Sequence, residues 1–270
     1  MNKIILLLAL FTVLKTQAQK NIDGLIQAEK NFAAYSVAHN TKEAFLQFID
    51  TAGVVFEKGE AVNGMQLWNK RQKQAGVLNW HPQFAEIAGS GDFGYTTGPW
   101  TFQPKTINDS VVARGQYTTI WTIDKQGEWK FLLDLGVGGL PSTDSLDVQK
   151  IETSKVVTKR IDLLSMVKTE EAFIKAYKKE PVLAYKQFLS TQSILNRNGF
   201  LPAVSVVDQS KLIVSTPQKL AFAIISSGIA KTGDLGFVYG SVQSDKKENY
   251  LHIWRNEKEG WKLALEVLRY

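Results

Sequence analysis

The chain has 270 residues, of which 44% are hydrophobic and 21% charged, and it contains no cysteine. This composition excludes wholesale disorder. The lack of cysteine excludes disulfides, thiolate zinc sites and cysteine nucleophiles. The formal net charge is +6, but the basic residues are dispersed rather than gathered in a stripe with aromatic residues. Nucleic acid is therefore not an expected partner.

Residues 1–18 have the pattern of a secretory signal peptide. Lys3 supplies a positive start, residues 4–14 form an apolar run, and Thr16 and Ala18 place small residues where a signal peptidase reads. The apolar run is shorter than the roughly 20 residues needed to span a bilayer. We therefore expect a periplasmic or secreted protein, with no membrane segment after signal cleavage.

The elements that follow predict an α+β fold. Apolar residues recur at helical spacing over residues 22–33. Further predicted elements are helices over 42–49 and 64–74, and strands over 54–56, 83–88, 93–102, 111–123 and 129–136. Helices followed by antiparallel strands indicate an α+β domain. Because such a sheet needs one covered face, we expect the first helix to cover a curved sheet and leave a cone-shaped cavity.

The second half of the chain repeats the first. The Gly-Asp-x-Gly segment 91–98 returns as 233–240, Trp121 returns as Trp254, and Trp129 returns as Trp261, all in the same order. We therefore predict a first domain over 19–140, a linker over 141–160 that becomes helical near its end, and a second, more divergent domain over 161–270. The two copies are expected to pack sheet to sheet as an intramolecular pseudo-dimer.

The first copy resembles a known superfamily. The residues that carry the resemblance are the segment 91–100, Tyr117 with Trp121, and Trp129-Lys130. They are similar to the SnoaL-like and ketosteroid-isomerase-like proteins, which have the nuclear transport factor two fold, and above all to a branch known only as a domain of unknown function. The resemblance implies a cone-shaped α+β domain. It does not specify a reaction, since the superfamily includes isomerases, cyclases, hydratases and non-catalytic modules.

Two motifs are assigned structural roles. Residues 89–94 read Gly-x-Gly-x-x-Gly, but strand-like residues follow where a dinucleotide site needs a helix, so a turn is predicted. The histidines His39, His81 and His252 show no metal-ligand spacing. We therefore expect no metal and no cofactor. His252 stands where the first copy has Thr119, and we expect it to be a structural histidine with satisfied hydrogen bonds.

A carboxylate in the apolar stripe of the first helix is the main candidate for chemistry. Glu29 lies one turn before Phe32, and Glu170 lies in the same place before Phe173 in the second copy. A buried carboxylate must be paired or protonated. Two interpretations stay open: a pocket acid or base with a raised pKa, or a structural carboxylate bonded by indole, hydroxyl or backbone groups.

The last strand of each copy carries a second acid. Asp134 and Glu266 occupy matching positions. In a regular strand Asp134 points to the opposite face from the more hydrophobic residues 129, 131, 133 and 135, so Asp134 is expected to face away from the core. The candidate catalytic residues are Glu29 and Asp134. The candidate ligand-binding residues are Glu29, Trp80, Tyr95, Trp100, Arg114, Tyr117 and Trp121.

Two functions are compatible with these residues. The first is an exported module that binds a small apolar molecule in the first cone or serves as a scaffold. The alternative is a cofactor-independent isomerase, cyclase or hydratase that uses a pocket carboxylate as general base and Tyr95 or Tyr117 as hydroxyl donor. In the second copy, Phe222 and Phe237 replace Trp80 and Tyr95, so its interior is expected to be purely structural.

Overall fold

The computed structural model describes residues 19–140, 146–152, 162–217 and 219–270, so the predicted signal peptide lies outside the described residues. The first domain consists of α1 (Ile22–Ala38), α2 (Thr41–Phe48), β1 (Ile49–Glu57), β2 (Glu60–Asn63), α3 (Gly64–Lys70), β3 (Val77–Trp80), β4 (Phe84–Ile87), β5 (Phe93–Gln103), β6 (Ala113–Ile123), β7 (Trp129–Gly138) and β8 (Gln149–Glu152). The second domain consists of α4 (Leu163–Lys179), α5 (Pro181–Phe188), β9 (Leu189–Arg197), α6 (Val206–Ser215), β10 (Ala221–Ile229), β11 (Leu235–Gln243), β12 (Lys247–Glu257) and β13 (Gly260–Leu268).

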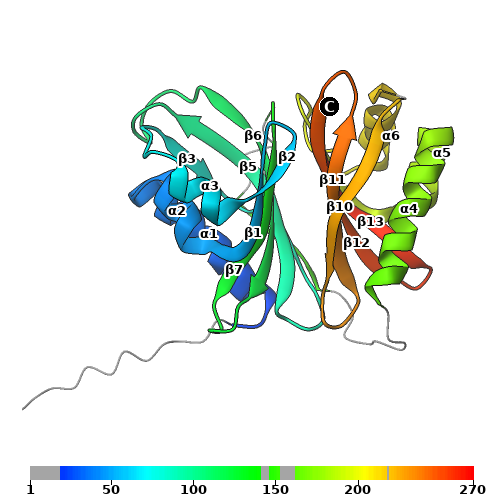
Figure 1. The fold of residues 1–270 in the computed structure, drawn as a ribbon, viewed down its shortest axis with the longest axis horizontal. Coiled ribbons are helices and arrows are strands. Elements are labelled where there is room, and N and C mark those ends of the chain that lie inside the picture. The colour runs from blue at the N-terminus through cyan, green and yellow to red at the C-terminus, as the bar shows by residue number, and fades with distance from the viewer. Residues whose placement is uncertain (1–18, 141–145, 153–161, 218) are drawn as a thin grey trace, which may run out of the picture.

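Each domain has helices packed on one face of a curved sheet, as Figure 1 shows. The first sheet has the strand order β2-β1-β7-β6-β5-β4-β8, with β3 also paired to β5. The second has the order β10-β11-β12-β13-β9. Most pairs are antiparallel, but β1 joins β7 and β9 joins β13 in parallel. The predicted α+β class is thus confirmed, with sheets that are mixed rather than purely antiparallel.

Most predicted elements of the first domain are present with similar limits. The three helices begin at residues 22, 41 and 64, and the strands of 93–103, 113–123 and 129–138 form the centre of the sheet. The strand β8 lies inside the segment predicted as linker and pairs in parallel with β4. The predicted helical end of that linker falls mostly outside the described residues.

The first helix begins and packs as its sequence dictates. The Asn21 side chain accepts a hydrogen bond from the backbone N–H of Gly24 at 2.8 Å, which satisfies one of the free donors at the helix start. The apolar stripe that includes Leu25 and Phe32 is buried against the sheet, at 0% and 1% exposure. Glu29 lies on the same buried face, so the helical phase predicted from the sequence is right.

The repeated Gly-Asp-x-Gly segments form the same turn in both domains. Gly91 and Gly233 have φ of 70° and 71°, a region that favours glycine. In each turn the glycine N–H donates to the carbonyl of the alanine three residues earlier, at 2.8 Å for Gly91 and Ala88 and at 2.9 Å for Gly233 and Ala230. The turn predicted for the glycine-rich motif is therefore present, with strands on both sides.

The two sheets face each other across one buried apolar layer (Figure 1). This layer includes Phe93, Leu133 and Leu135 from the first domain and Phe237 and Leu265 from the second. The rings of Phe93 and Phe237 stack with centroids 6.1 Å apart. The helices of each domain therefore lie on the outer side of its sheet.

A buried ion pair crosses the same layer. The guanidinium of Arg255 on β12 donates two hydrogen bonds to the Glu86 carboxylate on β4, at 2.5 and 2.7 Å. Glu86 is fully buried and also accepts a bond from the Tyr95 hydroxyl at 2.7 Å. Because a buried charge needs a partner, this contact ties the two domains to one relative position.

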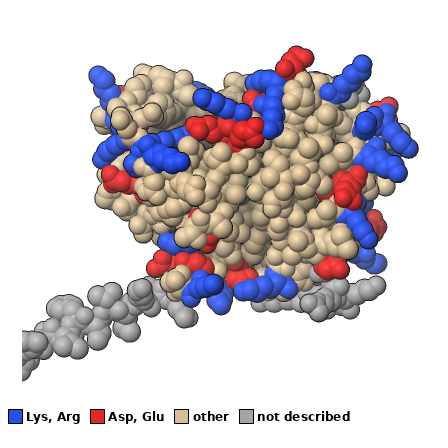
Figure 2. Space-filling model, viewed as in Figure 1, with Lys and Arg blue, Asp and Glu red and all other residues tan. Residues whose placement is uncertain are grey.

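The outer surface carries charges of both signs. On the face shown in Figure 2, Lys and Arg side chains alternate with Asp and Glu around the edge, and the centre is largely uncharged. None of the helices in the described ranges is long and apolar enough to cross a membrane.

Candidate functional site

A cavity of about 230 Å³ lies between the helices and the sheet of the first domain. Its apolar wall consists of Phe32, Phe45, Leu78, Trp80, Trp100 and Tyr117. Asp134, the backbone of residues 136–138 and Arg269 form the remaining wall. The cone predicted from the sequence therefore contains open space, lined by aromatic rings together with Asp134 and Arg269.

A β-bulge turns Asp134 into this cavity. The pairing of β6 with β7 shifts by one residue between Ile120 and Trp121. Phe131 consequently packs on the helix side, whereas Leu133 packs between the sheets. The expectation that Asp134 faces away from the core is wrong, because a bulge reverses the alternation that regular strand geometry implies.

The Asp134 carboxylate sits in an environment that disfavours its charge. Burial raises its pKa to about 6, while a hydrogen bond from the Thr119 hydroxyl at 2.8 Å and the nearby Arg269 oppose the shift. A carboxylate with such a pKa can accept a proton near neutral pH.

Arg269 is a cavity residue that the sequence did not indicate. It follows the last strand of the second domain, and its Nε donates to the carbonyl of Gly136 at 2.7 Å. Arg114, the arginine among the candidate ligand-binding residues, is exposed on β6 instead. No local sequence pattern could have shown that Arg269 and not Arg114 lines the cavity, since Arg269 reaches the site only through the contact between the domains.

Glu29 is sealed behind the cavity wall. It is fully buried and is not among the residues that line the cavity. Its oxygens accept bonds from the indole N–H of Trp80 at 2.5 Å, the indole N–H of Trp121 at 2.9 Å and the hydroxyl of Thr96. Burial raises its pKa to about 7, against the opposing effect of these three bonds. The geometry is that of a fully bonded carboxylate, one of the two interpretations left open above.

The other candidate residues divide between the two faces of the sheet. Trp80, Trp100 and Tyr117 line the cavity, and Trp121 lies beneath it as a donor to Glu29. Tyr95 does not lie in the cone. Its neighbour Thr96 points to α1, so alternation along β5 turns Tyr95 into the layer between the sheets.

The interior of the second domain is occupied by a buried polar network. His252 bridges Glu170 through Nδ1 and Glu266 through Nε2, both at 2.9 Å. Glu266 also accepts from the Tyr185 hydroxyl at 2.8 Å and from Arg197. The residues of this network are at most 1% exposed. Both ring nitrogens of His252 are thus hydrogen-bonded, in keeping with a structural histidine.

Charges hold this network together. Burial alone would lower the pKa of His252, but the two glutamates outweigh burial and raise it to about 9. Burial would raise the pKa of Glu266, but Arg197 and His252 outweigh it and lower it to about 2. In the described part of the chain, no group of three or more acidic or histidine side chains is arranged to hold a metal ion.

Several solved structures are similar to part of this chain. A ketosteroid isomerase-like protein from Erwinia carotovora atroseptica SCRI1043 has 16% identity and a TM-score of 0.34, covering 38% of this chain and 92% of its own. An NTF-2-like protein of unknown function from Shewanella oneidensis MR-1 has 13% identity and a TM-score of 0.32, covering 39% and 97%. A Nostoc punctiforme PCC 73102 protein of unknown function with a cystatin-like fold has 13% identity and a TM-score of 0.34, covering 41% and 94%.

The similarity concerns the fold alone. Each of these proteins matches about 40% of this chain. Their fold names are those that the resemblance in the sequence implied. No protein-family model and no curated protein matches the chain.

Proposed function

We propose that this chain is an exported protein whose first domain binds a small, largely apolar molecule carrying one polar group. The observation that carries the proposal is the cavity of about 230 Å³ in the first domain. Aromatic walls remove apolar ligand surface from water, and one or two polar groups fix its orientation. Asp134 and Arg269 supply those groups. The support for export is the signal-like pattern of residues 1–18.

The second domain is proposed to act as a support for the first. Its interior is occupied by the His252 network, and its C-terminal Arg269 reaches the first-domain cavity. The pseudo-dimer proposed here would therefore contribute one residue to a site whose other described walls belong to the first domain.

Titration of the full mature chain with 2-naphthol tests the binding proposal, and ligand-observed NMR and calorimetry measure the binding. Its two rings suit the aromatic wall, and its hydroxyl can donate to Asp134. We expect saturable binding, weakened about tenfold by Trp100→Ala. Trp261→Ala removes the same atoms from the core of the second domain and should leave the affinity unchanged. Equal weakening by both variants, or no binding to the wild type, would contradict the proposal.

A second candidate function rests on the placement of Asp134 in the cavity wall. A half-buried carboxylate with a pKa of about 6 could remove a proton from a carbon next to a carbonyl group. The probe is 2-tetralone in deuterium oxide, with NMR measurement of hydrogen exchange beside the carbonyl. Under this hypothesis the exchange rate rises with pH through about 6 and Asp134→Asn removes the catalysed part. A hydrogen-exchange rate no higher with the protein than in buffer alone would contradict the enzyme hypothesis and leave the binding proposal intact.

A further inference from the structure

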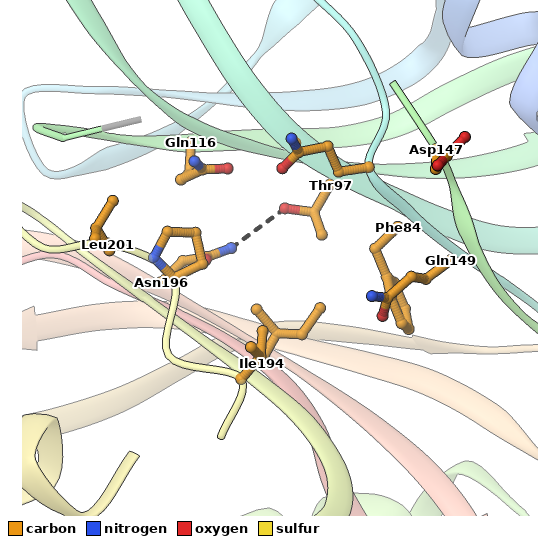
Figure 3. A pocket seen from close by; sticks show the side chains of 12 residues that line it. Phe84, Thr97, Gln116, Asp147, Gln149, Ile194, Asn196 and Leu201 are labelled. Atoms are coloured by element: carbon orange, nitrogen blue, oxygen red, sulfur yellow. Dashed lines mark hydrogen bonds between the residues drawn. The ribbon is translucent and has the colours of Figure 1, made fainter. Parts of the chain in front are cut away.

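A second, larger cavity lies between the two domains. It measures about 310 Å³ and is distinct from the first-domain cone, with which it shares no lining residue. Figure 3 shows its walls: Phe84, Thr97 and Gln116 come from the first domain, and Ile194, Asn196 and Leu201 come from the second. The volume falls at the lower end of the range of roughly 300 to 1,000 Å³ that is usual for small-molecule sites.

The inner wall of this interdomain pocket is polar and buried. Thr97 and Gln116 are 4% and 3% exposed, and Asn196 is 2% exposed. The Asn196 amide donates to the Thr97 hydroxyl at 3.2 Å, the bond drawn in Figure 3. The amide oxygen of Asn196 is buried without a hydrogen-bond partner. A buried acceptor without a partner is unfavourable, so a ligand donor at this point would be stabilised.

The outer wall is more apolar and more exposed. Phe84 and Ile194 cover the sides, and Leu201 is 54% exposed at the rim. The Gln149 side chain, exposed on β8, adds an amide on the opposite side. The pocket therefore offers hydrogen-bonding groups on its inner wall and at Gln149 on the opposite side, with apolar groups, including an aromatic ring, between them and at the rim.

The charge of the lining restricts the ligand. Within the described residues, no lysine or arginine lines the pocket, and Asp147 is its one charged residue. The described lining therefore offers no cation to an anionic ligand. Amide and hydroxyl side chains both donate and accept, which is the complement of a molecule whose hydroxyl groups do the same.

We propose that the interdomain pocket binds a small neutral polyhydroxylated molecule, of the size of one sugar unit. Hydroxyl groups at one end would meet Asn196 and Gln116, one of them donating to the free amide oxygen of Asn196, and a hydroxyl at the other end would meet Gln149. Its C–H face would lie against Phe84 and Leu201. The pocket exists only where the two domains meet, so a single-domain protein could not form it.

The test uses the full mature chain and named sugars. N-acetylglucosamine and glucose are titrated by saturation-transfer NMR and calorimetry, with glucuronate as the anionic comparison. We expect saturable binding of at least one neutral sugar and weaker binding of glucuronate. Asn196→Leu and Gln149→Ala should each weaken the neutral sugar about fivefold, the effect of one neutral hydrogen bond.

Controls separate this site from the cone and from misfolding. Gln149 and Gln126 are both exposed, but Gln126 lies in a distant turn, so Gln126→Ala should leave sugar affinity unchanged. Trp100→Ala alters only the cone and should also leave it unchanged. Because Gln149→Ala alters an exposed side chain, it remains informative if Asn196→Leu unfolds. The proposal is overturned if no neutral sugar binds the wild type, if Gln149→Ala binds it equally well, or if N-acetylglycinamide binds and the sugars do not.

Discussion

Glu29 and Asp134 are both carboxylates on the helix-covered side of the first sheet, yet their surroundings suit different roles. Glu29 is fully buried and held by three donors. Asp134 lines the cavity and accepts a hydrogen bond from the Thr119 hydroxyl. The two carboxylates differ in whether a ligand in the cavity can reach them, and not in the direction of their pKa shift, since burial raises the pKa of both. We therefore assign a structural role to Glu29 and reserve the proposal of proton transfer for Asp134.

Glu29→Gln should change the pH dependence of stability. The folded-state pKa of Glu29 is raised from 4.5 to about 7, so in this window the folded chain holds a proton that the unfolded chain has lost. The free energy of unfolding of the wild type should then fall by roughly 3 kcal/mol as pH rises through the window. The variant cannot titrate and should lack this part of the fall. Urea unfolding at pH 4.5 and pH 8 measures the difference, and parallel pH profiles for the two proteins would refute the assignment.

The second network predicts a different pH window. The pKa of His252 is raised from 6.5 to about 9, so its stabilising charge is fully present below 6.5 and lost as pH rises through 9. This loss amounts to roughly 3 kcal/mol. His252→Gln should therefore be much less stable than the wild type at pH 6.5 and differ less at pH 9.5. Thr119→Val, at the matching position of the first domain, should cost about 1 kcal/mol at both values. An equal deficit of the histidine variant at both pH values would contradict this account.

At the scale of elements, the duplicated turns and bulges have the same geometry in both domains. The shift in pairing between β6 and β7 recurs between β12 and β13, at Ile253 and Trp254. Each bulge brings an acid, Asp134 or Glu266, to the helix side of its sheet. The side chains opposite these acids differ: Thr119 is small, whereas His252 is large enough to bridge two glutamates. This single difference helps to leave the first cone open and the second one occupied.

Gly91→Ala should destabilise the first turn. The residue has φ of 70°, and an added Cβ would meet the carbonyl oxygen of Lys20 at 2.5 Å. We expect a loss of about 1 to 3 kcal/mol in the free energy of unfolding. Gly138→Ala is the matched control, since a Cβ there meets nothing within 4 Å and φ is not positive. Equal unfolding midpoints in urea for both variants would show that the turn geometry is not required.

At the scale of the whole molecule, the two domains share one interior. The apolar layer between the sheets and the Arg255–Glu86 pair are formed by both domains together. Unfolding one domain would expose the inner sheet face of the other and leave a buried charge without its partner. We therefore expect a single unfolding transition when tryptophan fluorescence and histidine NMR signals are followed in urea. Two separated transitions would contradict a shared interior.

Arg255→Met should destabilise the chain strongly. It leaves Glu86 fully buried without a cation, which costs about 3 to 5 kcal/mol. The double variant Glu86→Met, Arg255→Met removes both charges and should recover most of the loss. Lys73→Met, which breaks an exposed pair with Glu43, should cost less than about 1 kcal/mol. Thermal unfolding of the four proteins checks this order, and a double variant as unstable as Arg255→Met alone would contradict it.

Local periodicity in the sequence determined the repeat, the α+β class, the phase of the first helix with Glu29 on its buried face, and the glycine turn. The helix phase, the α+β class and the turn depend on residues a few positions apart, and the repeat shows as the same short motifs returning in the same order, so the sequence alone reveals them. The tertiary structure decided the rest. A bulge of one residue turned Asp134 into the cavity, and alternation from Thr96 turned Tyr95 out of it. Arg269 and the interdomain pocket arise from contacts between segments more than 90 residues apart in sequence, which no local pattern encodes.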